Sequence, residues 1–273
     1  MQEKYEHGRK AGNMGDVFKH VALIAGLRET CSAATHDPFR YADTFAAYAM
    51  NILKGEDEWK QGIGKLDSEC LLKGNPDVAF WATRWLDGIP KVSGRYPGSS
   101  WFARETCKSL GRDIQMSLWE IAEKPLTDLR AMYPDGHVFS RPAKPDDPNI
   151  IAADFVFIDP PSKDDWEDIL GMVKSLSIPP KQSVLVWLPI GPNTGCSPPI
   201  EDKSSGACRQ QGLKLGLSTT TVRWHRGGRM IGCQLLYRVN PRAQQALRRA
   251  VEDLFECTGF QFDDVLGVRH FDS

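Results

Sequence analysis

The stretch FVFIDPPS, residues Phe155 to Ser162, decides the fold. Four apolar residues in a row are typical of a strand that is buried on both faces of a parallel sheet. An aspartate and two prolines follow at once, and prolines commonly end strands and begin turns. In open α/β sheets ligands bind beyond the carboxyl ends of the strands, so we expect Asp159 at a binding edge.

An exocyclic amine is a suitable ligand for this arrangement. The Asp159 carboxylate and the Pro160 carbonyl can both accept hydrogen bonds from an amino group, which turns the nitrogen lone pair toward a methyl donor. The fixed φ of proline keeps the carbonyl in place. On these residues alone, a simple strand end without any chemistry is an equally good interpretation.

Short β-rich runs recur on both sides of this strand, separated by helical or Pro/Gly-rich segments. That pattern predicts an α/β fold with a doubly wound sheet, and the last two runs read as an antiparallel hairpin. The seven predicted strands are residues 39–46, 113–118, 137–140, 154–159, 183–188, 213–224 and 233–239.

Two helices have clear starts. Asp16 is predicted to cap the first, and Asn240 with Pro241 begins a second whose apolar residues share one face. Both helices are expected to pack on the sheet. Residues Asn51 to Gly94 are too many for one crossover, so we predict an inserted helical subdomain at 51–94 within a main domain of 1–50 and 95–273.

Composition excludes several classes of protein. The 273 residues include 34 Lys+Arg and 35 Asp+Glu, a formal net charge of -1, which excludes a uniformly basic protein. No apolar run is long enough for a membrane span and the first ten residues lack a secretory core, so a cytoplasmic protein is expected. Seven cysteines without C-x-x-C spacing predict reduced thiols, with neither disulfides nor a metal site.

Several motifs together identify a resemblance. The segments Ala11 to His20 (AGNMGDVFKH), FRYADTF, EWKQGIGKL, Tyr96 to Arg104 (YPGSSWFAR) and FVFIDPP occur in this order. The chain resembles the RlmJ family, S-adenosylmethionine-dependent methyltransferases that modify an adenine amino group in large-subunit ribosomal RNA. The resemblance implies a class I, Rossmann-like fold with a seven-stranded sheet, S-adenosylmethionine as cofactor and RNA as partner.

The same resemblance implies roles for individual residues. It makes Asp159 the catalytic residue, with Pro160 beside it. It places His20 and Ser99 at the cofactor and Tyr5 at the RNA. The full set of candidate residues for the cofactor is His20, Lys19, Asp43, Phe45, Ser99 and Glu120, and for the RNA substrate it is Tyr5, Asn13, Ser162, Trp166, Arg226 and Arg229, the two arginines being chosen from the basic segment HRGGRMIG.

The chain also departs from the family pattern. The glycine-rich turn D-T-H-A-G-x-G reads DTFAAYA here, from Asp43 to Ala49. Leu118 stands where an acid should contact the cofactor's ribose, unless a register shift brings in Glu120. Pro142 and Ala143 replace an Asp-Gly pair, and Ser162 replaces an aromatic that stacks on the target base, a role that Trp166 is placed to take over.

An uneven distribution of charge points to RNA. From Lys203 to Ala250 the chain contains no Asp or Glu but has ten Lys and Arg residues, interleaved with Trp224 and His225. A solvated basic surface is the plain alternative. The leading hypothesis is a monomeric RNA adenine methyltransferase. The rival is a catalytically inactive or repurposed protein of the same fold that binds RNA or a different small molecule.

Overall fold

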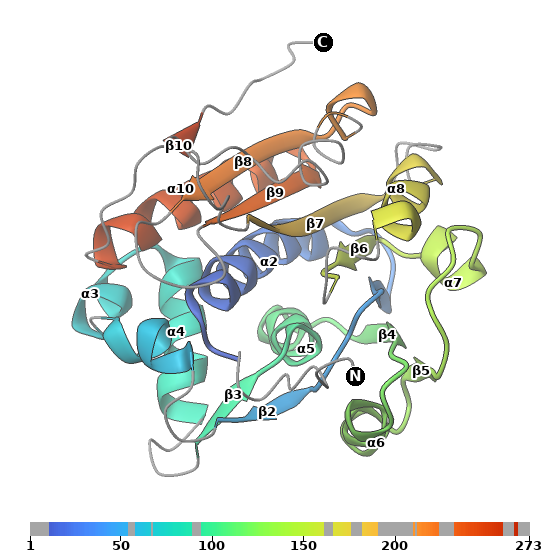
Figure 1. Cartoon of the computed structure of the whole chain (residues 1–273), viewed down its shortest axis with the longest axis horizontal. Coiled ribbons are helices and arrows are strands. Elements are labelled where there is room, and N and C mark those ends of the chain that lie inside the picture. The colour runs from blue at the N-terminus through green and yellow to red at the C-terminus, as the bar shows by residue number, and fades with distance from the viewer. Residues whose placement is uncertain are drawn as a thin grey trace, which may run out of the picture.

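The computed structural model describes residues 11–53, 58–66, 68–88, 94–160, 166–175, 182–190, 210, 212–223, 232–258 and 265–266. Within them a mixed sheet carries helices on both faces (Figure 1). Its strands run in the spatial order β10, β8, β9, β7, β6, β1, β4, β5. Their bounds are β1 Phe39–Asp43, β4 Ile114–Trp119, β5 His137–Phe139, β6 Phe155–Ile158, β7 Ser183–Ile190, β8 Ser218–Arg223, β9 Gly232–Arg238 and β10 Val265–Leu266.

The sheet confirms the predicted α/β class. Strands β5, β4, β1, β6 and β7 pair in parallel, and β9 pairs antiparallel with both β7 and β8. Leaving out the two-residue β10, the order is third, second, first, fourth, fifth, seventh, sixth along the chain. This is the Rossmann-like order of class I methyltransferases, with the predicted hairpin at one end.

The run FVFI is apolar throughout because both of its faces are covered. Phe155 and Phe157 lie in the core that includes α2 (Met14–Ala33) and α5 (Ser99–Ser109). Val156 and Ile158 lie in a second core with residues of α7 (Pro148–Ile151) and α8 (Trp166–Ser175). Helix α6 (Glu123–Met132) connects β4 to β5.

Some predicted boundaries were wrong. The first strand ends at Asp43 rather than at residue 46, because the chain turns there into the loop that follows β1. The run that begins at Leu213 becomes a strand only at Ser218, since residues 212–214 are helical. Strand β10, which extends the sheet beside β8, was not predicted.

The helix caps correct one assignment. Asn13, not Asp16, caps α2, because its side-chain oxygen accepts from the Asp16 N–H at 3.0 Å. The Asp16 carboxylate in turn accepts from the Gly12 N–H at 2.8 Å, so the two side chains tie the helix start together. Helix α10 (Pro241–Thr258) begins as predicted, and Asn240 accepts from the Ala243 N–H at 2.8 Å.

The two helices were both expected to pack on the sheet. Helix α2 does so, and nearly its whole circumference is buried. Helix α10 packs along α2, and it also contacts the sheet, since the Gln244 side chain donates to the Ser218 hydroxyl of β8 at 3.4 Å and Leu247 shares the first core with Leu235 of β9. The apolar face predicted for α10, residues Ala243, Leu247, Ala250, Val251 and Leu254, is buried.

The segment between β1 and α5 contains short helices, as expected. It holds β2 (Met50–Ile52), η1 (Glu58–Gln61), η2 (Ile63–Lys65), α3 (Ser68–Lys73), α4 (Pro76–Gly88) and β3 (Arg95–Pro97). Strand β2 pairs antiparallel with β3, so the segment leaves and rejoins the main chain at one place. Leu71, Val78 and Trp81 share the core with α2, and the division into two domains stays a prediction.

The prediction of reduced thiols was wrong for one pair. A disulfide joins Cys70 of α3 to Cys257 of α10, because these helices pack together and bring the two Cα atoms to 5.5 Å. Cys31, Cys107 and Cys233 are free and buried, and Cys196 and Cys208 lie outside the described residues. In the part of the chain that the structure describes, no helix is long and apolar enough to span a membrane, and no side chains cluster as metal ligands.

Candidate functional site

The candidate site lies where the direction of the sheet reverses. The chain passes from β1 to β4 and β5 on one side, and then to β6 and β7 on the other. Ligands of such sheets bind at this switch point, beyond the carboxyl ends of the strands. Asp43 is the last residue of β1 and Asp159 is the first residue after β6, so both carboxylates lie at that edge.

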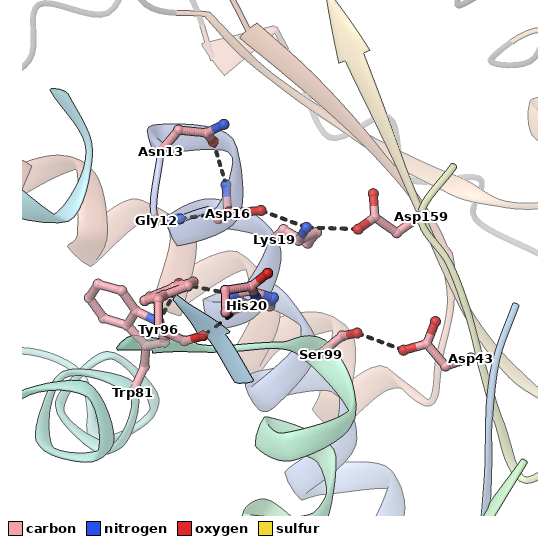
Figure 2. A network of polar contacts seen from close by, with 11 residues as sticks. Gly12, Asn13, Asp16, Lys19, His20, Asp43, Trp81, Tyr96, Ser99 and Asp159 are labelled. Atoms are coloured by element: carbon pink, nitrogen blue, oxygen red, sulfur yellow. Dashed lines mark hydrogen bonds and ion pairs between the residues drawn. The ribbon is translucent and has the colours of Figure 1, made fainter. Parts of the chain in front are cut away.

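Lys19 of α2 connects two carboxylates in the site (Figure 2). Its Nζ lies 2.7 Å from Asp159 Oδ2 and 2.6 Å from Asp16 Oδ1. The same atom lies 5.5 Å from the centre of the Trp187 ring, within range of a cation–π contact. The three charged side chains are only 12% to 17% exposed, so their attraction is weakly screened by water.

The pKa values follow from burial and from this pairing. Burial raises the pKa of Asp159, and the Lys19 ammonium opposes that rise. Burial also works to lower the pKa of Lys19, but Asp159 and Asp16 hold it well above its usual value. Lys19 is therefore a permanent cation.

Asp43 has a separate set of partners. The Ser99 hydroxyl donates to its Oδ2 at 2.6 Å, the Tyr41 hydroxyl donates to the same oxygen at 3.0 Å, and the Phe45 N–H donates to Oδ1 at 3.3 Å. Burial raises the pKa of Asp43 to about 6; the Ser99 hydrogen bond opposes the rise and the Asp159 charge adds to it. Asp43 therefore titrates near neutral pH.

His20 belongs to a third group of buried polar contacts. Its Nδ1 lies 2.9 Å from the Tyr96 hydroxyl, to which the Trp81 indole N–H donates at 3.3 Å. Its ring also lies 4.9 Å from that of Phe102, centre to centre. Burial lowers the pKa of His20 to about 3, and the Lys19 charge contributes to the shift. His20 is consequently neutral at physiological pH.

The loop after β1 keeps the backbone of a glycine turn without the glycines. Ala47 has φ 48°, a left-handed conformation that glycine adopts more readily. The Ala49 and Met50 N–H groups donate to Asp128 Oδ2 at 2.8 and 3.2 Å, which anchors the end of the loop. Of the two alanines that replace glycines in this turn, Ala47 is left-handed and Ala49 is not.

The loop is also held by the YPGSS segment. The Gly98 N–H donates to the Ala49 carbonyl at 2.9 Å. A Cβ atom at Gly98 would lie 2.1 Å from the Tyr48 carbonyl oxygen, so only glycine fits there. Gly98 also forms the N-cap of α5, which means that Ser99 is the first helical residue and its side chain is free to reach Asp43.

Glu120 lies at the same edge of the sheet, directly after β4. Its carboxylate accepts from the N–H groups of Ile121 and Ala122 at 2.8 and 2.7 Å and is partly exposed. Leu118 is buried and is the β4 partner of Asp43, so it has no access to a ligand. Of the two positions considered from the sequence, Leu118 and Glu120, it is Glu120 that has a carboxylate at this edge.

The remaining predicted residues are dispersed. Phe45 is half-buried and packs on the second core, Asn13 is used as a helix cap, and Pro160 is buried beside Asp159. Trp166 is the first residue of α8. Tyr5, Ser162, Arg226 and Arg229 lie outside the described residues.

Sequence reasoning missed several members of the site. The sequence predicts Asp16 only as a helix cap, although its spacing of three residues from Lys19 on a helix is typical of an ion pair. Trp187 contacts Lys19 from β7, and Tyr96 and Trp81 contact His20 across the fold. Those contacts join segments far apart in the chain, which no local pattern reveals.

A cleft of about 360 Å³ lies at the opposite edge of the sheet. Its lining includes Phe39, Asp154 and Ser183, which mark the amino ends of β1, β6 and β7. The cleft is therefore separate from the carboxylates at the switch point, and the topology favours the latter as the site of chemistry.

One comparison with solved structures supports the fold along the whole chain. The crystal structure of protein LPL1258 from Legionella pneumophila, of the DUF519 family, is 17% identical and superposes with a TM-score of 0.70. The match covers 95% of this chain and all of that one. At this identity the likeness shows a shared fold alone.

Two methyltransferase structures overlap much less. The CMeT domain of citrinin polyketide synthase is 8% identical, with a TM-score of 0.34 over 51% of this chain and 42% of its own. A SAM-dependent methyltransferase from Aquifex aeolicus is 12% identical, with a TM-score of 0.33 over 51% of this chain and 77% of its own. Neither overlap is strong enough to support an argument. No family model and no curated protein sequence matches the chain.

Proposed function

We propose that this protein is an S-adenosylmethionine-dependent methyltransferase that acts on the exocyclic amine of adenine in RNA. One observation carries the proposal: on a class I fold, Asp159 follows the fourth strand directly and lies at the switch point, across from Asp43 at the end of the first. An acceptor for an amine and a group of cofactor-facing polar residues thus share one edge of the sheet.

The residues present fit the cofactor. The loop after β1 retains a left-handed residue at Ala47, as a backbone that closely approaches a ligand requires. Lys19 is paired with Asp16 and Asp159, and the charge of Asp159 also acts on the nearby Asp43, so three carboxylates share one ammonium group in this region. The excess of negative charge favours a cationic ligand such as a sulfonium.

Specific side chains would hold the cofactor in that place. Asp43, Ser99 and Glu120 lie at or beside the carboxyl ends of β1 and β4, and His20 follows Lys19 on α2. When bound, S-adenosylmethionine supplies a methyl group activated by the positive charge on its sulfur. After β5, Pro142 and the buried Ala143 stand in place of an Asp-Gly pair, so no side chain there offers a polar contact to the cofactor.

Asp159 would orient the amine. Lys19 contacts Oδ2, and among the described residues no group bonds to Oδ1, which leaves that oxygen to accept from the amino group. The Pro160 carbonyl is the second acceptor, fixed by the proline ring. With both N–H bonds so engaged, the nitrogen lone pair points toward the methyl donor, and the residues act by positioning. The adenine must leave its base stack to reach them.

Charge supports RNA as the partner. The first half of α10 exposes Arg242, Arg248 and Arg249, and Arg248 is paired with Glu252 at 2.7 Å. Lys214 of the acid-free stretch is also exposed, whereas Lys203, Arg209, Arg226 and Arg229 lie outside the described residues. Phosphate contacts of this kind predict RNA affinity that falls steeply as salt concentration rises.

Calorimetric titration and methyl transfer test the proposal together. We expect the full chain to bind S-adenosylmethionine and S-adenosylhomocysteine and to label ribosomal RNA from the radioactive donor. Asp159→Asn is expected to abolish labelling while binding of the donor persists. Asp135→Asn, at an exposed turn, is the matched control and should label normally. Failure to bind either ligand would disprove the proposal.

The second candidate function is RNA binding without catalysis, by a protein of the same fold. It is favoured by the alanines in the turn after β1 and by Lys19, which already occupies one oxygen of Asp159. This alternative predicts RNA affinity that is unchanged in Asp159→Asn and no methyl transfer. Binding of a different small molecule at Asp43 or Asp159 would instead show a repurposed pocket.

A further inference from the structure

We propose that Tyr96 and Trp81 are positioning residues that hold His20 in one tautomer, with its proton on Nε2, so that His20 offers a hydrogen-bond donor to the cofactor site. This inference deepens the proposed function and rests on it. It assigns a role in the site to Trp81 of α4, a helix of the segment between β1 and α5.

Three buried groups determine where the protons lie (Figure 2). The Trp81 indole nitrogen can only donate, and it donates to the Tyr96 hydroxyl at 3.3 Å. The Tyr96 side chain is fully buried, so its own proton needs an acceptor. The acceptor that the described residues provide is His20 Nδ1 at 2.9 Å. His20 must therefore be unprotonated at Nδ1.

The neutral state of His20 places its one remaining proton on Nε2. His20 is 2% exposed, so burial disfavours a charged ring, and the neighbouring Lys19 ammonium disfavours it further. Among the described residues no group is bonded to Nε2, and Nε2 is not one of the fully shielded polar atoms that lack a partner, so the atom remains accessible to a ligand. We assign a ligand at the carboxyl edge as the acceptor for this N–H.

A donor at this point selects the chemistry of its ligand. A neutral N–H binds an acceptor, and the carboxylate at the amino-acid end of the methyl donor is an acceptor of suitable charge beside Lys19. The opposite tautomer would present a lone pair and repel a carboxylate. Tyr96 and Trp81 thus set the polarity of His20 without touching the ligand.

The test is a long-range proton–nitrogen NMR spectrum of the full chain with ¹⁵N-labelled histidine. The His20 signals are identified by their loss in His20→Gln. We expect a protonated Nε2 and a hydrogen-bonded, unprotonated Nδ1. Tyr96→Phe should shift the Nδ1 signal to that of a nitrogen without a donor, and Trp81→Phe should shift it less in the same direction. Trp101→Phe, a partly buried tryptophan packed on Phe102, is the control and should leave it unchanged.

Several results would overturn the inference. A proton on Nδ1 in the unmodified protein is sufficient by itself, even if no variant folds. An Nδ1 signal that does not respond to Tyr96→Phe excludes Tyr96, and one that does not respond to Trp81→Phe excludes Trp81.

Ligand binding separates this inference from the proposed function. Tyr96→Phe is expected to weaken binding of S-adenosylhomocysteine about threefold to tenfold, as loss of one hydrogen bond predicts. An unchanged affinity would refute the effect on the ligand. If the unmodified protein binds neither cofactor form while the NMR pattern holds, the proposed function fails and the tautomer assignment stands.

Discussion

Replacing Ala47 by glycine is expected to stabilise the protein. Ala47 lies in the loop between β1 and β2 with φ 48°, which brings the Cβ of an L-residue too close to the following carbonyl. Glycine has no Cβ and adopts this conformation without strain. Ala47 is only half-buried, so removing its methyl group costs little packing.

The size of the effect follows from two opposing contributions. Relief of the left-handed strain is worth about 1–2 kcal/mol. Glycine makes the unfolded chain more flexible, at a cost of about 0.5–1 kcal/mol. The expected net gain in the free energy of unfolding is about 0.5–1 kcal/mol.

Ala46→Gly is the matched control in the same loop. Ala46 is 1% exposed and its φ is not positive, so glycine there loses a buried methyl group and gains no relief of strain. We expect a loss of about 1.5 kcal/mol, from about 0.8 for the methyl group and the rest for chain flexibility. The two variants should therefore differ by about 2 kcal/mol.

Urea unfolding followed by tryptophan fluorescence measures both variants, and thermal unfolding repeats the measurement. In a chain of this size, 2 kcal/mol corresponds to a difference of about 4–8 °C in Tm. Equal destabilisation by Ala46→Gly and Ala47→Gly would refute the reasoning, because it would show that Ala47 is not strained.

Three further predictions concern charge and close packing. As pH falls from 7 to 5, Asp43 becomes protonated because its pKa is about 6. Calorimetry should then show that the affinity for S-adenosylmethionine, which carries a positive sulfur, falls several-fold more than the affinity for S-adenosylhomocysteine, whose sulfur is neutral. A constant ratio of the two affinities would contradict this. Lys19→Met should lower the free energy of unfolding by about 3 kcal/mol at pH 8, because it leaves two buried carboxylates without their cation. The loss should be clearly smaller at pH 4, where protons can neutralise these carboxylates. An equal loss at both pH values would count against the ion pairs. Gly98→Ala should lower the free energy of unfolding in urea by about 1–3 kcal/mol, because its Cβ would lie 2.1 Å from the Tyr48 carbonyl oxygen. Gly171→Ala in α8 is the control: its Cβ would have its nearest contact at 3.7 Å, so the substitution should be neutral or stabilising.

The sheet was predictable because strand patterns are local. The run from Phe155 to Ile158 is apolar at every position because both faces of β6 are covered, and that cause can be seen in four residues. The ends of strands were less predictable. The strand at Phe39 stops at Asp43, although apolar residues continue beyond it, because the chain turns there and the Asp43 carboxylate accepts from the Phe45 N–H.

The site was predictable only in part, because its contacts are not local. Resemblance indicated Lys19 and Asp159 separately, but their ion pair spans 140 positions and depends on how α2 crosses β6. The turn after β1 shows the opposite error. Its missing glycines suggested a lost conformation, whereas the anchoring of the loop by Asp128 and Gly98 coexists with a strained alanine.

The bond between Cys70 and Cys257 divides the site by covalent connectivity. It closes a ring of chain that contains Ser99 and Asp159, while α2 and β1, with Lys19 and Asp43, lie outside that ring. A single cut between Leu53 and Glu58 would therefore separate the protein into two pieces that no disulfide joins. The smaller piece carries strand β1 and the carboxylates of Asp16 and Asp43, whereas the larger piece carries Asp159. Activity after such a cut would therefore report fragment complementation, with each piece inert until the other restores its core.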